Sequence, residues 1–243
     1  MQSLLICGLM VVALVAPAEV LAQPDPDALY RQRADLARAR EAAAIWQMRV
    51  AADPKDFESS WKLARPTYWL GEHDQQDTRR TWLERGVEVA RAAAALEPKR
   101  PEGHFWMAAN MGALAESFGL RQGLRYRGPI KDALERVLRL DPAYLQGSAD
   151  RALGRWYHRV PGLFGGDKKK AEDHLRRSLT YNPDSTVSHF FLAETLFELD
   201  RDAEAIQELQ KVIDAPLDPD FEPEDREYKQ RAAGLLARRR PKG

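Results

Sequence analysis

The chain is short of the residues that build covalent or metal-based sites. Its 243 residues include one cysteine, so no disulfide can form within the chain and no cysteine zinc cluster exists. Charge of one sign is not in excess either, because 37 Lys and Arg balance 37 Asp and Glu. A neutral chain offers no general attraction to nucleic acid, which we do not expect as a partner. Few runs alternate with period two and β-branched residues are sparse, which argues against a β-sheet.

Long hydrophobic runs are also rare, and the main one lies at the N-terminus. Residues 4–15 (LLICGLMVVALV) are apolar without interruption, and Val20-Leu21-Ala22 gives a small-residue cleavage pattern. This run is too short to span a bilayer, which takes about 20 apolar residues. We therefore expect residues 1–22 to be a cleavable signal peptide and the mature chain to be soluble, periplasmic or secreted. The alternative is a segment that is retained as an anchor.

A short sequence motif that ends in proline recurs along the chain. The prolines are spaced by 44, 44, 41 and 33 residues: Pro54, Pro98, Pro142, Pro183 and Pro216. An alanine stands ten residues after each of the first four: Ala64, Ala108, Ala152 and Ala193. Small residues at fixed sites let helices approach closely. Apolar residues recur with helical spacing before the prolines, and proline ends a helix. The spacing therefore predicts two helices between successive prolines.

This is the pattern of the tetratricopeptide repeat (TPR), a unit of about 34 residues with two helices. We predict an all-α fold in which TPR-like helical hairpins stack into a solenoid or bundle over residues 23–216. The first three units are longer than a standard repeat. We expect their extra residues to form insertions between the two helices of each unit, near 71–80, 119–128 and 158–166, and to emerge on one edge.

The last part of the chain, residues 217–243, differs in composition from the repeats. Six acidic side chains stand between residues 217 and 227 against Arg226 alone. Tyr228–Arg240 then has the spacing of an amphipathic helix with Ala232, Leu235 and Leu236 on its inner side. We therefore expect an acidic linker, a C-terminal helix that caps the solenoid, and a basic tail.

Motifs for catalysis and for cofactors are missing. The sequence holds no G-x-S-x-G, P-loop, Rossmann glycine fingerprint or H-E-x-x-H. His104 and His189 occupy the same repeat position two units apart, which places them too far apart to share a metal ion. Paired carboxylates could be sought among Glu116, Glu172 and Glu194, but no spacing selects a pair. We expect no enzyme activity, no metal and no cofactor.

The middle of the chain is basic and rich in aromatic residues. Residues 121–170 hold twelve Lys or Arg and five Asp or Glu. Arginine beside aromatic rings suits carboxylate or phosphate groups on apolar bodies, although a solvated helix face over core aromatics is the alternative. In Gly154–Asp167, Pro161 and the glycines that follow it impose a non-helical path. Leu163 and Phe164 in this loop either plug a cavity or lie exposed for a partner.

Four stretches in the second half of the chain are distinctive. They are RALGRWYHRVPGLFGGDKKKAEDHL (151–175), SHFFLAETL (188–196), IDAP (213–216) and PEDREYK (223–229). Through them the sequence resembles the T-component family of tripartite ATP-independent periplasmic (TRAP) transporters. The resemblance implies a helical TPR protein, a homotrimer, which docks the periplasmic substrate-binding protein of the transporter and has an apolar channel. Members can be lipoproteins, but Cys7 follows Ile6 rather than a small residue, so we expect no lipidation here.

Together these observations predict an exported TPR-like adaptor that binds a protein partner, with an apolar channel for a small amphipathic or anionic ligand. The residues expected to contact partner or ligand are Trp106, Asn110, Arg151, Arg155, Trp156, Tyr157, His158, Leu163 and Phe164. The alternative is a structural envelope-assembly TPR protein that has no small-molecule ligand and whose aromatic residues all belong to the core.

Overall fold

The fold is built from α-helices alone in the part of the chain, residues 23–239, that the computed structural model describes. The predicted signal peptide 1–22 and residues 240–243 lie outside that part. The helices are α1 Pro26–Arg31, α2 Leu36–Ala52, α3 Phe57–His73, α4 Gln76–Leu96, α5 Pro101–Ser117, α6 Leu120–Leu140, α7 Tyr144–Arg159, α8 Lys168–Tyr181, α9 Thr186–Phe197, α10 Asp202–Asp214 and α11 Glu222–Arg239, with a short 3₁₀ turn η1 at Gly162–Phe164.

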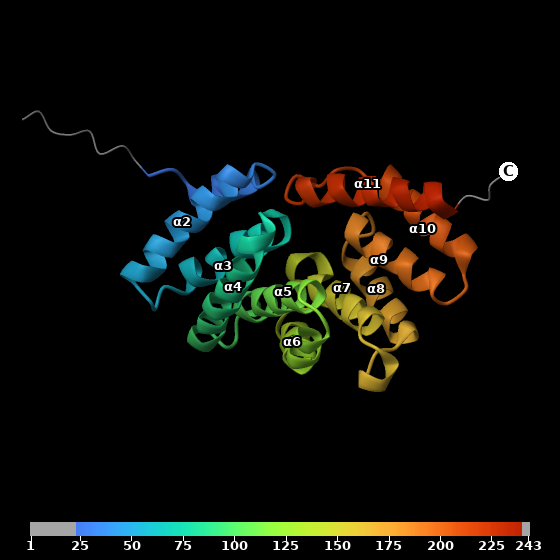
Figure 1. The fold of residues 1–243 in the computed structure, drawn as a ribbon, viewed down its shortest axis with the longest axis horizontal. Coiled ribbons are helices and arrows are strands. Elements are labelled where there is room, and N and C mark those ends of the chain that lie inside the picture. The colour runs from blue at the N-terminus through green and yellow to red at the C-terminus, as the bar shows by residue number, and fades with distance from the viewer. Residues whose placement is uncertain (1–22, 240–243) are drawn as a thin grey trace, which may run out of the picture.

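The helices pair as the proline spacing predicts. Each stretch between successive repeat prolines forms one antiparallel hairpin: α3 with α4, α5 with α6, α7 with α8, and α9 with α10. The hairpins follow one another in an arc from α2 to α10, and α11 crosses above α9 and α10 (Figure 1). The predicted all-α, TPR-like fold is therefore confirmed. None of the helices among residues 23–239 is long and apolar enough to cross a membrane.

Short polar side chains and small residues explain why the hairpins form where they do. Asp56, Asp167 and Ser185 each precede a helix and accept hydrogen bonds from its first backbone N–H groups. The repeat alanines Ala64 and Ala193 are fully buried where neighbouring helices meet. At such sites a larger side chain would hold the helices apart.

The extra residues of the first two units lengthen helices, which corrects the prediction of insertions near 71–80 and 119–128. Each of these hairpins pairs a helix of 17 residues with one of 21. Only two residues join α3 to α4, and Leu70 and Leu83 beside that turn are fully buried. The added helical turns therefore bury apolar side chains, which a polar loop would not do. Only the third unit has a loop, at residues 160–167.

The C-terminal helix begins earlier than its apolar spacing suggests. It starts at Glu222 rather than at Tyr228, so half of the expected acidic linker is helical. Acidic side chains in the first turn of a helix are favourable because the helix dipole is positive there. Ala232 is fully buried, and Leu235 and Leu236 pack against the smaller of the two main hydrophobic cores, as expected.

The arc of hairpins closes into a ring. The start of α11 returns to the turn between α1 and α2, and the two segments lie close together at the top of Figure 1. Arg33 from that turn donates to the Glu224 carboxylate (Nε–Oε1 3.0 Å) and to the Asp220 carbonyl (2.8 Å). Side chains of the first helices meet on the inner side of this ring, where Arg155 of α7 contacts Glu116 of α5 and Glu194 of α9.

Candidate functional site

Two arginines on one side of α7 face the inner surface, and they differ in their partners. Arg155 pairs with Glu194 of α9 (2.7 Å) and with Glu116 of α5 (3.0 Å). Its guanidinium also lies 4.6 Å from the Phe191 ring. Arg155 thus ties three helices together, and its hydrogen-bond donors are occupied by the protein itself.

Arg151, one turn earlier, has no such partner. Among residues 23–239 no carboxylate oxygen lies within 4.0 Å of its guanidinium, and burial lowers the pKa of Arg151. Arginine remains charged in proteins even so. A cation that loses hydration without gaining a partner is costly. Arg151 is therefore the inner-surface residue whose surroundings best suit an anionic group from outside the chain.

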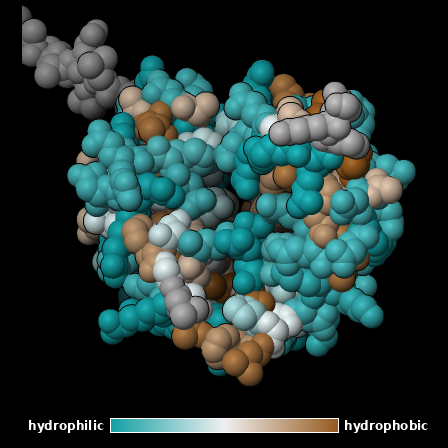
Figure 2. Space-filling view, turned by 45° about the vertical axis from the view of Figure 1, so that its right-hand side comes forward, coloured by the Kyte–Doolittle hydropathy of each residue, from teal (hydrophilic) through white to brown (hydrophobic). Residues whose placement is uncertain are grey.

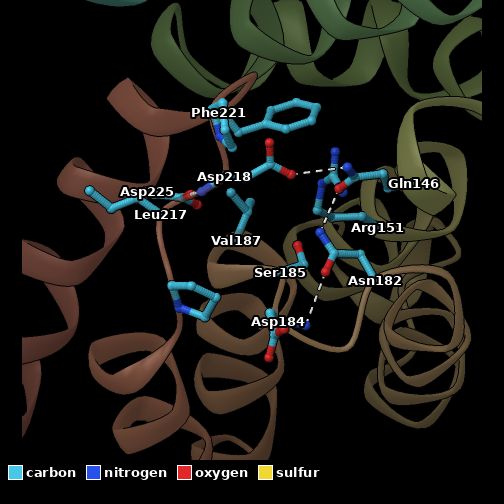
Figure 3. A pocket seen from close by; sticks show the side chains of 12 residues that line it. Gln146, Arg151, Asn182, Asp184, Ser185, Val187, Leu217, Asp218, Phe221 and Asp225 are labelled. Carbon is cyan, nitrogen blue, oxygen red and sulfur yellow. Dashed lines mark hydrogen bonds between the residues drawn. The ribbon is translucent and has the colours of Figure 1, made fainter.

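Arg151 lines a cavity of about 270 Å³ between the start of α7, the α8–α9 turn and the linker before α11 (Figure 3). Polar side chains form one wall. The Gln146 amide donates to Asp218 (Nε2–Oδ2 3.0 Å), and its oxygen accepts from the Asn182 amide. Leu217 and Phe221 supply apolar surface to the same cavity. The site therefore combines a cation, an amide chain and an apolar wall.

The backbone beside this cavity is strained. Leu145, Gln146 and Gly147 have φ angles of 45°, 58° and 75°, all in the left-handed region. Residues with a Cβ rarely adopt this conformation and tend to do so where the surrounding structure holds them, often at functional sites. Here Gln146 is held by its bonds to Asp218 and Asn182. The strain places the Gln146 side chain in the cavity wall.

The loop after α7 presents an apolar side chain to solvent. Leu163 is 90% exposed, and Phe164 is half-buried with the Arg127 guanidinium 5.2 Å from its ring. Backbone bonds close the turn, with the Phe164 N–H donating to the Pro161 carbonyl at 2.8 Å. A Cβ on Gly166 would lie only 1.6 Å from the Val160 carbonyl oxygen. The loop is thus well anchored, and Leu163 does not plug a cavity.

Figure 2 shows that most of the face in view is hydrophilic, with a hydrophobic group at its lower edge. A single exposed leucine is ordinary, but one at the tip of an anchored loop can enter a pocket on a partner.

The three residues before the loop are buried and support it. Trp156 donates from its indole to the Arg127 carbonyl (2.8 Å), and Tyr157 stacks on His174 with ring centroids 5.3 Å apart. His158 contacts the Thr195 hydroxyl at 3.1 Å. Burial, together with the nearby Lys168 ammonium, lowers the pKa of His158 to about 4. His158 is therefore neutral at physiological pH and packs as a polar core residue.

The nine predicted site residues therefore lie in three places. Trp106 and Asn110 belong to the core of the N-terminal half, where the Asn110 amide donates to the carbonyls of Ala64 (3.1 Å) and Trp106 (2.8 Å). Arg151 and Arg155 face the inner surface. The remaining five form the loop and its buried support: Trp156, Tyr157, His158, Leu163 and Phe164.

Sequence reasoning missed the rest of the cavity wall. Gln146, Asn182 and Asp218 come from three segments that are far apart in the chain, and none belongs to a recognisable motif. The only available signal was the dense acidic and proline-rich linker from Pro216 to Glu224, whose composition by itself indicates no more than a connection.

The profile of the TRAP transporter T-component family matches residues 64–241, a span that includes both the cavity and the loop. The chain belongs to the TRAP transporter T-component family. No curated protein matches this T-component. Among residues 23–239, no group of three or more His, Cys, Asp or Glu side chains is arranged to hold a metal ion.

Solved TPR proteins resemble this T-component in fold. TTC0263, described as a thermophilic TPR protein in Thermus thermophilus, has a TM-score of 0.66 at 22% identity, covering 87% of this chain and 97% of that one. MamA has a TM-score of 0.50 at 16% identity, covering 82% of this chain and 95% of that one. At this identity the likeness shows the helical-repeat fold alone.

Proposed function

We propose that this T-component is an exported, non-enzymatic adaptor that binds a protein partner through the loop Pro161–Gly166. The exposure of Leu163 on an anchored loop is the observation that carries the proposal. Family membership supports a TRAP transporter's periplasmic substrate-binding component as the partner, and the periplasm as the location. It also supports assembly as a homotrimer.

An anchored loop with an apolar tip suits recognition for a physical reason. Because the loop is already fixed, docking orders few additional groups and costs little conformational entropy. A leucine that enters a pocket on the partner buries nearly its whole side chain, which contributes about 1.5–3 kcal/mol. The surrounding Arg127, Arg159 and Lys169 would favour an acidic rim on the partner.

A pull-down with matched variants tests this docking surface. The double variant Leu163→Asp with Phe164→Asp should lose the captured substrate-binding protein, identified by mass spectrometry, from a periplasmic extract. The control Ile206→Asp changes a 39% exposed apolar residue on α10 and should capture the protein as the unaltered chain does. Circular dichroism should show the same helix content in all three. Equal capture by the double variant would contradict the proposed surface.

We further propose that the inner surface holds a small amphipathic or anionic ligand. The unpaired Arg151 guanidinium beside apolar Phe221 supports this more than a structural, ligand-free adaptor. Native mass spectrometry of the gently extracted protein separates the two functions. A trimer with a small bound mass supports the ligand-binding adaptor, whereas a bare monomer supports the structural alternative.

A further inference from the structure

The cavity beside Arg151 contains charges of both signs that do not pair with one another. Asp218 and Asp225 line it together with Arg151. Asp218 accepts from the Gln146 amide at 3.0 Å and from the Asp220 N–H at 2.9 Å. Within the described part of the chain, no Lys, Arg or His nitrogen lies within 4.0 Å of either carboxylate. Charges inside a protein are normally paired, because losing hydration without a partner is costly.

Neutral hydrogen bonds hold these charges apart. Asp225 accepts from the Thr186 hydroxyl (2.6 Å) and from the Asp218 backbone N–H (2.8 Å), which fixes the linker against α9 and α11. Gln146 holds Asp218 from the other side (Figure 3). Since Gln146 is kept in a left-handed conformation to make this contact, the arrangement costs backbone energy.

We propose that this cavity binds a small zwitterion of the amino-acid class, with its carboxylate on Arg151 and its ammonium group on Asp218. The inference deepens the ligand-binding part of the proposed function and rests on that part alone.

The chemistry of the wall selects this class of ligand. A guanidinium offers two parallel N–H donors that match a carboxylate. Each Asp218 oxygen uses one acceptor site within the protein and has a second for an ammonium hydrogen. A simple anion would meet Arg151 but would be repelled by Asp218 and Asp225. Leu217 and Phe221 cover the carbon chain between the two ends.

The size of the cavity limits the ligand to a small molecule. Its volume of about 270 Å³ is slightly below the range of drug-sized ligand pockets, which span about 300–1,000 Å³. A single amino acid or a short ω-amino acid fits this volume, whereas a lipid or a nucleotide does not.

Calorimetric titration of the full chain tests the proposal with three probes of one length. They are 4-aminobutyrate, which carries both charges, butyrate, which carries only the carboxylate, and butylamine, which carries only the ammonium. Leucine extends the set of zwitterions. We expect at least one zwitterion to bind about tenfold or more tightly than either singly charged probe, since only the zwitterion makes charge-assisted hydrogen bonds at both ends.

Two variants assign the ends of the ligand. Arg151→Met should weaken zwitterion binding about tenfold without weakening butylamine binding. Asp218→Asn should weaken zwitterion binding similarly without weakening butyrate binding, because it removes a charge that repels the anion. The control Arg139→Met removes an exposed arginine on α6 and should change neither affinity. Thermal melting checks that the variants fold. If Arg151→Met does not fold, Arg151→Lys provides a second variant, which preserves the positive charge.

Two results would overturn the inference. One is butyrate binding as tightly as 4-aminobutyrate with loss of both in Arg151→Met, which would indicate a simple anion site. The other is a folded chain that binds none of the zwitterions at millimolar concentration. These outcomes do not bear on the docking of a protein partner. The pull-down depends on Leu163 and Phe164, whereas the titration uses the isolated chain.

Discussion

The Arg33 guanidinium in the α1–α2 turn donates to the Glu224 carboxylate of α11, although 191 residues separate the two in the sequence. The Arg33 side chain is 3% exposed. A second link follows one helical turn along α11, where His73 of α3 meets Glu227 at 3.2 Å. These two contacts join the ends of the solenoid and close the arc of hairpins into a ring.

Removing Arg33 should destabilise the protein strongly. Arg33→Ala leaves the partly buried Glu224 carboxylate without its cation, which we expect to lower the free energy of unfolding by about 3 kcal/mol. Urea denaturation measures the difference. Arg38→Ala is the control. The Arg38–Glu41 pair is exposed on α2, the helix that follows Arg33, and should contribute less than about 1 kcal/mol. An equal loss of unfolding free energy in both variants would show that the Arg33–Glu224 contact contributes no more than an exposed ion pair.

The link between His73 and Glu227 should make stability depend on pH. Burial alone lowers the pKa of His73, but the hydrogen bonds to Glu227 and to the Trp69 carbonyl outweigh it, so that the pKa is raised overall. A raised pKa means that the contribution is fully present below the unfolded-state value of about 6.5 and is lost as pH rises through the folded-state value.

The measurement compares His73→Gln with the unaltered chain in urea at two pH values. We expect the substitution to cost more free energy of unfolding at about pH 6 than at about pH 9, where the native histidine is neutral. In a Glu227→Gln background the same comparison should depend less on pH, because the charged partner of His73 is gone. A cost that is independent of pH in the unaltered background would contradict the ion-pair interpretation.

Two glycines in long helices should respond oppositely to alanine. A Cβ on Gly86 would lie 2.0 Å from the Asn110 Oδ1 atom and 2.6 Å from the Thr67 hydroxyl oxygen, so Gly86→Ala should destabilise by about 1–3 kcal/mol. Gly112 has no atom within 4 Å of that position. Gly112→Ala should therefore stabilise by up to about 1 kcal/mol, because alanine is the better helix former. Chemical denaturation of both variants checks the sign, and a stable Gly86→Ala variant would show that the helices can separate at little cost.

The repeat was predictable because its signals are local. Each proline ends a helix within its own neighbourhood, and alanines such as Ala64 mark the close helix contacts ten residues later. The insertions near 71–80 and 119–128 were predicted wrongly because length alone does not distinguish a longer helix from a longer loop. The burial of Leu70 against its neighbouring helix decides between them, and it is visible only after folding.

The cavity could not be predicted from the sequence, because contacts between distant segments form it and no local pattern indicates them. Arg151 was predicted to contact a ligand because an arginine among aromatic residues suits an anion, and the structure places it in the cavity wall. Gln146 and Asp218 gave no signal, since their contact spans 72 residues and the left-handed backbone at Gln146 lies at a non-glycine position. Tertiary contacts at the linker before α11 impose that conformation, against the residue's own preference.

The strain at Gln146 can be measured by comparing two substitutions at the same position. Gln146→Ala and Gln146→Gly both remove the hydrogen bonds to Asp218 and Asn182, so these losses cancel in the comparison. The two variants differ mainly in the left-handed backbone, where an alanine Cβ costs about 1–2 kcal/mol and glycine costs little. The glycine variant should therefore be the more stable by about 1 kcal/mol.

The same pair of substitutions at an ordinary helical position provides the control. At the exposed Gln230 in α11, alanine should be the more stable residue by about 1 kcal/mol, because glycine loses more backbone freedom on folding. Opposite signs at the two positions, measured by urea denaturation, would establish that the protein gives up stability to hold Gln146 in the cavity wall. The same sign at both would mean that the backbone relaxes there, and the cavity would then lack the fixed amide on which its charge separation depends.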